Sequence, residues 1–125
     1  MKIRIQGNSI RLRLKQEEVT TLAETGAVED RLKFGPDESQ HLVYRLISAD
    51  VTGINTSFKD GTVVVELPEE DAKTWIWSNR IGFEQDVTVG GDESIHILVE
   101  KDFKCLEDRP DEEDLFPNPN AGETC

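Results

Sequence analysis

Cysteine is scarce in this 125-residue sequence, and it contains no long hydrophobic run. The two cysteines, Cys105 and Cys125, both lie near the C-terminal end, so a disulfide between them would tie down that end alone. No apolar run approaches the roughly 20 residues that a helix needs to cross a bilayer. The start, MKIRIQGNSIRLRL, alternates and lacks the apolar stretch of a signal peptide. We therefore expect a cytoplasmic protein that does not depend on disulfides and has no membrane partner.

Positive charge is also in short supply. Lysine and arginine number 14 against 26 aspartates and glutamates, which gives a formal net charge of −12. Binding to a phosphate backbone needs clustered Lys and Arg side chains, so the overall balance argues against nucleic acid as a partner. A local patch can differ from the sum, however, and the distribution of the charges matters more than their total.

The motifs of common catalytic and cofactor sites are missing as well. The sequence has no Gly-rich phosphate loop of the GxxxxGK(S/T) or GxGxxG kind, no GxSxG turn and no HExxH spacing. The acids around Cys105 have no spacing known for a metal site. We therefore predict no catalytic residue, no metal and no cofactor.

Alternating and helical patterns of apolar residues run through most of the chain. Alternation predicts strands over about 2–6, 10–14, 28–34, 42–48, 54–58, 63–67, 81–89 and 95–101. The spacing of Val19 and Leu22 predicts a helix that ends at Gly26, where a helix terminus favours a residue with positive φ. A second helix is predicted after Pro68, with acids in its first turn and Trp75 in its apolar stripe.

The two halves of the chain share this order of elements. The stretch SIRLRLKQEEVTTL at 9–22 matches TVVVELPEEDAKTW at 62–75, 53 residues later. Farther on, DESQHLVY at 37–44 matches DESIHILV at 92–99 at an offset of 55. We interpret the match as an internal duplication of a hairpin–helix–hairpin unit, with repeats at approximately 1–49 and 53–101.

These patterns predict a single α+β domain over residues 1–106. It should contain about eight mainly antiparallel strands and two helices, arranged as a curved sheet or a wide barrel. Residues 107–125 are rich in acids and proline, and their composition predicts a flexible tail. Within this tail, Leu115 and Phe116 are candidates for docking a protein partner.

Strand parity places several basic side chains on one face of the first half. Arg11 and Arg13, for example, lie on the face opposite Leu12. At these offsets, four basic residues of the first half correspond to acids of the second: Arg13 to Glu66, Arg31 to Glu84, Lys33 to Asp86, and Arg45 to Glu100. Two arrangements fit this pattern: an exposed face that keeps the protein soluble, or a charge-lined groove or channel between the halves.

The two histidines, His41 and His96, occupy equivalent positions at the offset of 55. Imidazoles related in this way could bind an anion or a metal, although a turn residue copied by duplication explains them too. Trp77 is a candidate for an exposed aromatic contact. For a ligand in the groove, the candidate binding residues are Arg11, Arg13, Arg31, Arg45, Glu66, Glu84, Glu100, His41 and His96.

The start MKIRIQGNSIRLRL, the segment VEKDFKCL and the tail motif FPNP resemble a family of small, uncharacterised bacterial proteins, known as a domain of unknown function. The resemblance covers nearly the whole chain and implies a bacterial, cytoplasmic protein. The duplicated architecture with a charged interior also looks like the triphosphate tunnel fold, which holds polyphosphate and a divalent metal in an eight-stranded barrel. The ExExK strand that marks that fold is absent, since Glu66 stands alone in VVVELP.

Two functions follow from these observations. The favoured one is a non-catalytic binding or interaction module with a protein partner at the tail, because catalytic motifs are missing. The alternative is an enzyme of triphosphate-tunnel type that binds or hydrolyses phosphate or polyphosphate in the charged groove. The enzyme requires the four arginines to converge with Glu66, Glu84 and Glu100 in one concave pocket.

Overall fold

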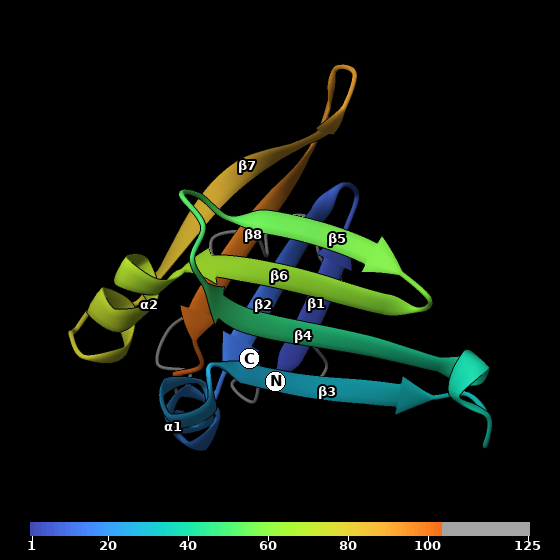
Figure 1. Cartoon of the computed structure of the whole chain (residues 1–125), viewed down its shortest axis with the longest axis horizontal. Coiled ribbons are helices and arrows are strands. Elements are labelled where there is room, and N and C mark those ends of the chain that lie inside the picture. Colours follow the sequence, from blue (N-terminus) through green and yellow to red (C-terminus); the bar gives the residue numbers. More distant parts are fainter. Residues whose placement is uncertain (104–125) are drawn as a thin grey trace, which may run out of the picture.

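Two four-stranded sheets and two helices form the protein in a computed structural model that describes residues 1–103 (Figure 1). No helix of this described part is long and apolar enough to cross a membrane. The elements, in chain order, are β1 (Lys2–Gln6), β2 (Ser9–Leu14), α1 (Gln16–Thr25), β3 (Ala27–Lys33), a 3-10 turn (Glu38–Gln40), β4 (His41–Ala49), β5 (Asn55–Lys59), β6 (Thr62–Pro68), α2 (Glu69–Ile76), β7 (Gly82–Gly90) and β8 (Glu93–Lys101).

The strands are ordered β1-β2-β8-β7 in one sheet, here called sheet A, and β3-β4-β6-β5 in the other, called sheet B. Each sheet consists of two antiparallel hairpins, whose inner strands pair in parallel as β2–β8 and β4–β6. The predicted α+β class with mainly antiparallel strands is therefore confirmed. The wide barrel is not formed, because β1, β7, β3 and β5 are sheet edges within residues 1–103 and the two sheets stay separate.

Each sheet combines one hairpin from each half of the chain. At equivalent points, the His96 N–H donates to the Asn8 carbonyl at 3.0 Å and the Val43 N–H donates to the Gly61 carbonyl at 2.9 Å. The register of the strands therefore makes His96 the structural equivalent of Val43, 53 residues earlier, and not of His41. In the neighbouring strands β7 and β3, Asp86 is the structural equivalent of Arg31, 55 residues earlier. The duplication stays a prediction. The sequence predicts an offset of 53 between β3 and β7 and of 55 between β4 and β8, whereas the structure has 55 and 53.

Helix α1 ends, and helix α2 begins, where the sequence predicts. Gly26 follows α1 with a φ of 82°, a left-handed conformation that glycine adopts without a Cβ clash, and its N–H donates to the Leu22 carbonyl at 2.9 Å. Helix α2 starts directly after Pro68 and carries three acids in its first turn. Each helix directs one large apolar residue into the core, Leu22 from α1 and Trp75 from α2.

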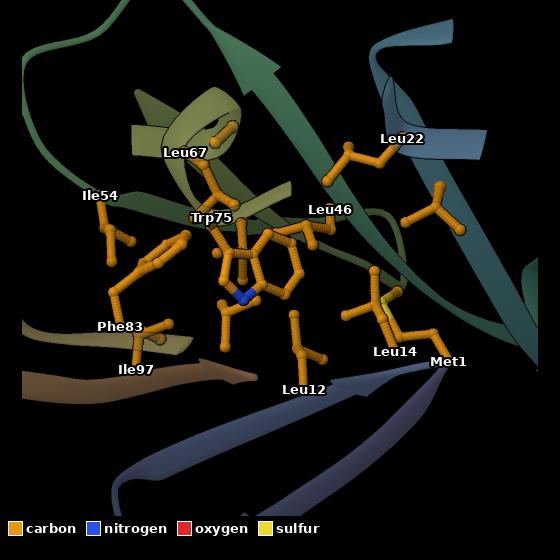
Figure 2. Close-up of a cluster of buried hydrophobic side chains, with 14 of the residues drawn as sticks. Met1, Leu12, Leu14, Leu22, Leu46, Ile54, Leu67, Trp75, Phe83 and Ile97 are labelled. Carbon is orange, nitrogen blue, oxygen red and sulfur yellow. The ribbon is translucent and has the colours of Figure 1, made fainter. Parts of the chain in front are cut away.

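The core lies between the inner faces of the two sheets, with Trp75 at its centre (Figure 2). The Trp75 indole is fully buried, donates its Nε1–H to the Ile81 carbonyl at 2.9 Å and packs edge-to-face on Phe83 with ring centroids 5.5 Å apart. Leu12 of sheet A and Val65 of sheet B contribute from opposite sides. Because strand side chains alternate, the residues between these apolar positions face away from the core on both sheets.

Candidate functional site

The outer face of sheet A carries a row of basic side chains. Leu12 and Leu14 of β2 are 1% exposed in the core, so Arg11 and Arg13 between them face outward. The antiparallel register places Arg4 of β1 opposite Arg11, and Lys2 opposite Arg13. We call these four residues, Lys2, Arg4, Arg11 and Arg13, the basic strip.

Two carboxylates from the C-terminal end of β8 balance part of this charge. Arg11 Nε and Arg13 Nε both donate to Glu100 Oε1, at 2.7 and 2.8 Å, and the Glu100 side chain is only 12% exposed. Lys2 Nζ lies 3.1 Å from Asp102 Oδ2. Arg4 Nη2 donates to the neutral Gln6 Oε1 at 3.4 Å. Within residues 1–103, Lys2, Arg11 and Arg13 thus each contact a carboxylate, in a chain whose net charge is −12.

Two shallow surface pockets lie along the basic strip and share Arg4 and Arg11. The smaller, of about 170 Å³, also involves Ser9 and His96, and the larger, of about 270 Å³, also involves Lys2 and Arg13. Pockets that enclose a drug-sized ligand usually measure about 300–1,000 Å³. The strip therefore suits small anionic groups, or the side chains of an extended segment, better than one enclosed ligand.

An acidic edge on β7 borders the same face. His96 Nδ1 lies 2.7 Å from Asp86 Oδ1, and His96 Nε2 lies 2.9 Å from Glu84 Oε2. The two hydrogen bonds, that from Asp86 first, raise the pKa of His96 above its ordinary value. The outer face of sheet A thus changes from basic at β1 to acidic at β7, with His96 at the border between them.

The outer face of sheet B holds a separate charged cluster. Arg45 Nε donates to Glu29 Oε1 at 2.8 Å, and Arg31 Nη2 donates to Glu29 Oε2 at 3.2 Å. These hydrogen bonds, that of Arg45 first, lower the pKa of Glu29. Arg31 Nη1 also contacts Nδ1 of His41 at 3.2 Å, while His41 Nε2 faces the Gly35 carbonyl at 3.1 Å.

The structure does not bring the predicted ligand residues together. Five of them, Arg11, Arg13, Glu84, Glu100 and His96, lie on the outer face of sheet A. The other four, Arg31, Arg45, Glu66 and His41, lie on the outer face of sheet B. The core separates the two faces, because the apolar residues that alternate with the charged ones pack against each other (Figure 1). The prediction of a charge-lined groove between the halves is therefore wrong, and the two histidines do not meet.

Other predicted residues fall outside this picture. Trp77 ends α2 and is 79% exposed, in agreement with the predicted exposed aromatic. Cys105, Leu115, Phe116 and Cys125 lie outside the described residues. Within residues 1–103, no group of three or more His, Cys, Asp or Glu side chains could hold a metal ion.

Sequence reasoning missed Lys2, Arg4 and Asp102 as members of the site. The alternation in MKIRIQ predicts that Lys2 and Arg4 belong to the basic face of the first half, and the register of β1 with β2 shows that they lie directly opposite Arg13 and Arg11. The pairing of Arg13 with Glu100 depends on the parallel contact between β2 and β8, which no local pattern reveals.

Comparison with known proteins gives the family but no activity. No curated protein matches the sequence. No solved structure matches it either. A family model described as a family of unknown function (DUF7009) matches residues 1–120, in agreement with the predicted resemblance to an uncharacterised family. The chain belongs to DUF7009, a family of unknown function.

Proposed function

We propose that this protein is a non-catalytic binding module of the bacterial cytoplasm, whose basic strip holds an acidic segment of a protein partner. One observation carries the proposal: four cationic side chains occupy neighbouring outward positions on β1 and β2. Such a cluster of cationic side chains in an acidic chain attracts anionic groups to one face.

The spacing of the strip suits an extended partner. Outward side chains follow each other along a strand at about 6.6–6.8 Å, and alternate side chains of an extended acidic segment repeat at the same distance. Guanidinium groups form strong hydrogen bonds with carboxylates and can do so through two N–H groups at once.

The position of β1 adds a second mode of contact. Within residues 1–103, β1 is an edge of sheet A, since β2 is its only strand neighbour there. An edge strand presents backbone N–H and carbonyl groups to which another strand can add. Lys2, with a side chain that is 67% exposed, and the exposed Arg4 lie on this strand. A partner strand added along β1 would place its acidic side chains next to theirs.

Fluorescence anisotropy with fluorescein-labelled decaglutamate tests the proposal. The variant Lys2→Gln/Arg4→Gln should raise the Kd at least tenfold at low salt, because two exposed charges of the strip are lost. The control Lys33→Gln/Lys59→Gln removes the same charge from exposed positions of sheet B. Equal Kd values for the two variants would overturn the proposed function.

A phosphate ligand on the same strip is the second candidate. The smaller pocket favours it, because Arg4, Arg11 and His96 surround a space of about 170 Å³, which suits a phosphate group. The test is a thermal-shift series with tripolyphosphate in parallel with the decaglutamate titration. Stabilisation by tripolyphosphate at concentrations where decaglutamate does not bind would favour the phosphate ligand. A tunnel-type enzyme would also need the closed barrel, which residues 1–103 do not form.

The tail prediction is kept as a separate part of the proposal. Leu115 and Phe116 are apolar residues in acidic, Pro-containing surroundings, a composition typical of docking segments. A pull-down with the variant Leu115→Ala/Phe116→Ala, compared with the unchanged chain, tests whether they anchor a partner. The same set of captured proteins in both samples would contradict this role.

A further inference from the structure

We infer that a second pocket, between the two helices and the end of β8, binds a small amphipathic carboxylate, meaning an acid whose apolar body ends in one carboxylate group. This pocket, here called the helix pocket, shares no residue with the basic strip. The inference therefore goes beyond the proposed function. The residues that carry it are Leu14, Val19, Thr20, Ile76, Lys101 and Phe103.

The helix pocket lies where two helices and two strand ends meet. Figure 1 shows that β8 ends between α1 and α2. Strand β2 ends at the same place, since Leu14 is the register partner of Lys101. The volume of the pocket is about 330 Å³, whereas pockets that bind a small molecule usually measure about 300–1,000 Å³. The helix pocket is thus large enough for a small ligand.

Apolar side chains provide one part of the lining. Leu14 is 1% exposed and belongs to the core. Val19 of α1 and Ile76 of α2 are half-buried and pack against that core. Phe103, which follows β8, is 59% exposed. A hydrocarbon group that covered these side chains would remove more of their apolar surface from water, which favours binding.

A lysine provides the only cation among the lining residues. Lys101 lies on the core side of sheet A, because its register partner Leu14 does so. Its Nζ donates to the Ser78 carbonyl at 2.8 Å, and within residues 1–103 no carboxylate contacts this ammonium group. An ammonium group has three N–H donors, so Lys101 can also donate to the carboxylate of a ligand.

The one acid in the lining does not neutralise this lysine. Asp102 Oδ2 lies 3.1 Å from Lys2 Nζ, on the outer face of sheet A, whereas Lys101 faces the core side. The pocket thus combines apolar side chains with one half-buried cation. A ligand that complements both has an apolar body and a single carboxylate.

Isothermal titration calorimetry of the full chain with octanoate and hexanoate tests the inference. Octanoate should bind about tenfold more tightly than hexanoate, because each CH₂ group removed from water tightens binding about threefold to fourfold. Octylammonium has the same apolar body with the opposite charge, and it should bind at least about fivefold more weakly than octanoate. Equal affinities for the two octyl compounds, or no binding of octanoate, would overturn the inference.

Variants of the lining assign the site. Lys101→Met removes the ammonium group and should weaken octanoate binding about fivefold, whereas Lys59→Met, at an exposed position of sheet B, should not. Thr20→Phe places a large side chain at an exposed position of the lining and should weaken binding of both acids. Thermal melts check that each variant is folded. Unchanged octanoate binding by folded Lys101→Met or by folded Thr20→Phe would refute the site.

Spectra separate this pocket from the basic strip. In ¹H–¹⁵N spectra, octanoate should shift the signals of Val19, Ile76 and Lys101. Shifts confined to Arg11 and Arg13 would overturn the inference, because the carboxylate would then bind the strip. Decaglutamate lacks an apolar body and should not shift the signals of the helix pocket. If it shifts them as octanoate does, charge alone selects the ligand and the inference fails, while the proposed function is judged by the strip variants.

Discussion

The substitution Glu100→Gln should destabilise the fold and strengthen acid binding at the same time. Glu100 Oε1 accepts hydrogen bonds from both Arg11 and Arg13, whose side chains are 27% and 20% exposed. A hydrogen bond to a charged group contributes about 1.5–3 kcal/mol when buried, whereas an exposed ion pair contributes about 0–1 kcal/mol. For this partly buried, shared carboxylate we expect a loss of about 2 kcal/mol.

That loss corresponds to a fall in Tm of about 10 °C for a domain of this size. Urea denaturation at pH 7 should show a lower midpoint with an unchanged slope. The charge of the strip rises by one, so decaglutamate should bind several-fold more tightly to the folded variant. The two effects have opposite signs, which a general loss of structure cannot produce.

Glu66→Gln is the matched control for this prediction. Glu66 faces outward from β6 of sheet B, and the described residues give it no ion pair. Its substitution should change the free energy of unfolding by no more than about 0.5 kcal/mol. The reasoning is refuted if Glu100→Gln costs no more stability than Glu66→Gln, or if it weakens decaglutamate binding.

Three further predictions concern the core, a helix end and pH. Trp75→Ala should cost about 3–5 kcal/mol in urea denaturation, because the indole is fully buried. Gly26→Ala should cost about 1 kcal/mol in thermal melts, because its φ is 82°. The pKa of His96 is raised in the folded state, so its contribution to stability is present below the unfolded pKa and is lost as pH rises through the folded pKa. His96→Gln should therefore lower the urea midpoint more at pH 5.5 than at pH 8.5, and equal changes would contradict this.

Local patterns in the sequence predict most of the secondary structure. Alternation locates the strands, because it reflects which side chains face the core, and Gly26 marks the end of α1 through its positive φ. The burial of Leu22 and Trp75 also follows from helical spacing. Each of these features depends on residues close together in the chain.

The pairing of one hairpin with another, β2 with β8 and β4 with β6, could not be predicted in this way. Alternation assigns Arg11 and Arg45 to outward faces, but it does not say that the two faces lie on different sheets. The sequence aligns His41 with His96 because DES precedes both. The strand pairs Ser9–His96 and Thr62–Val43 instead make His96 equivalent to Val43. The sequence therefore proposes Arg11, Arg13 and Glu100 as binding residues, but the contact between them depends on the long-range pairing of β2 with β8.

Each sheet combines a hairpin from the first half of the chain with one from the second, and this affects folding during synthesis on the ribosome. Arg11 and its partner Glu100 are 89 residues apart. At a synthesis rate of about 5–20 residues per second, Glu100 of β8 is therefore added roughly 5–18 s after Arg11 of β2. Until β8 is synthesised, the side of β2 that pairs with β8 in the complete sheet has no strand beside it. Arginines between apolar residues oppose the pairing of such an edge with another chain. Arg11 and Arg13 would thus reduce aggregation of the incomplete sheet before the folded protein binds any ligand.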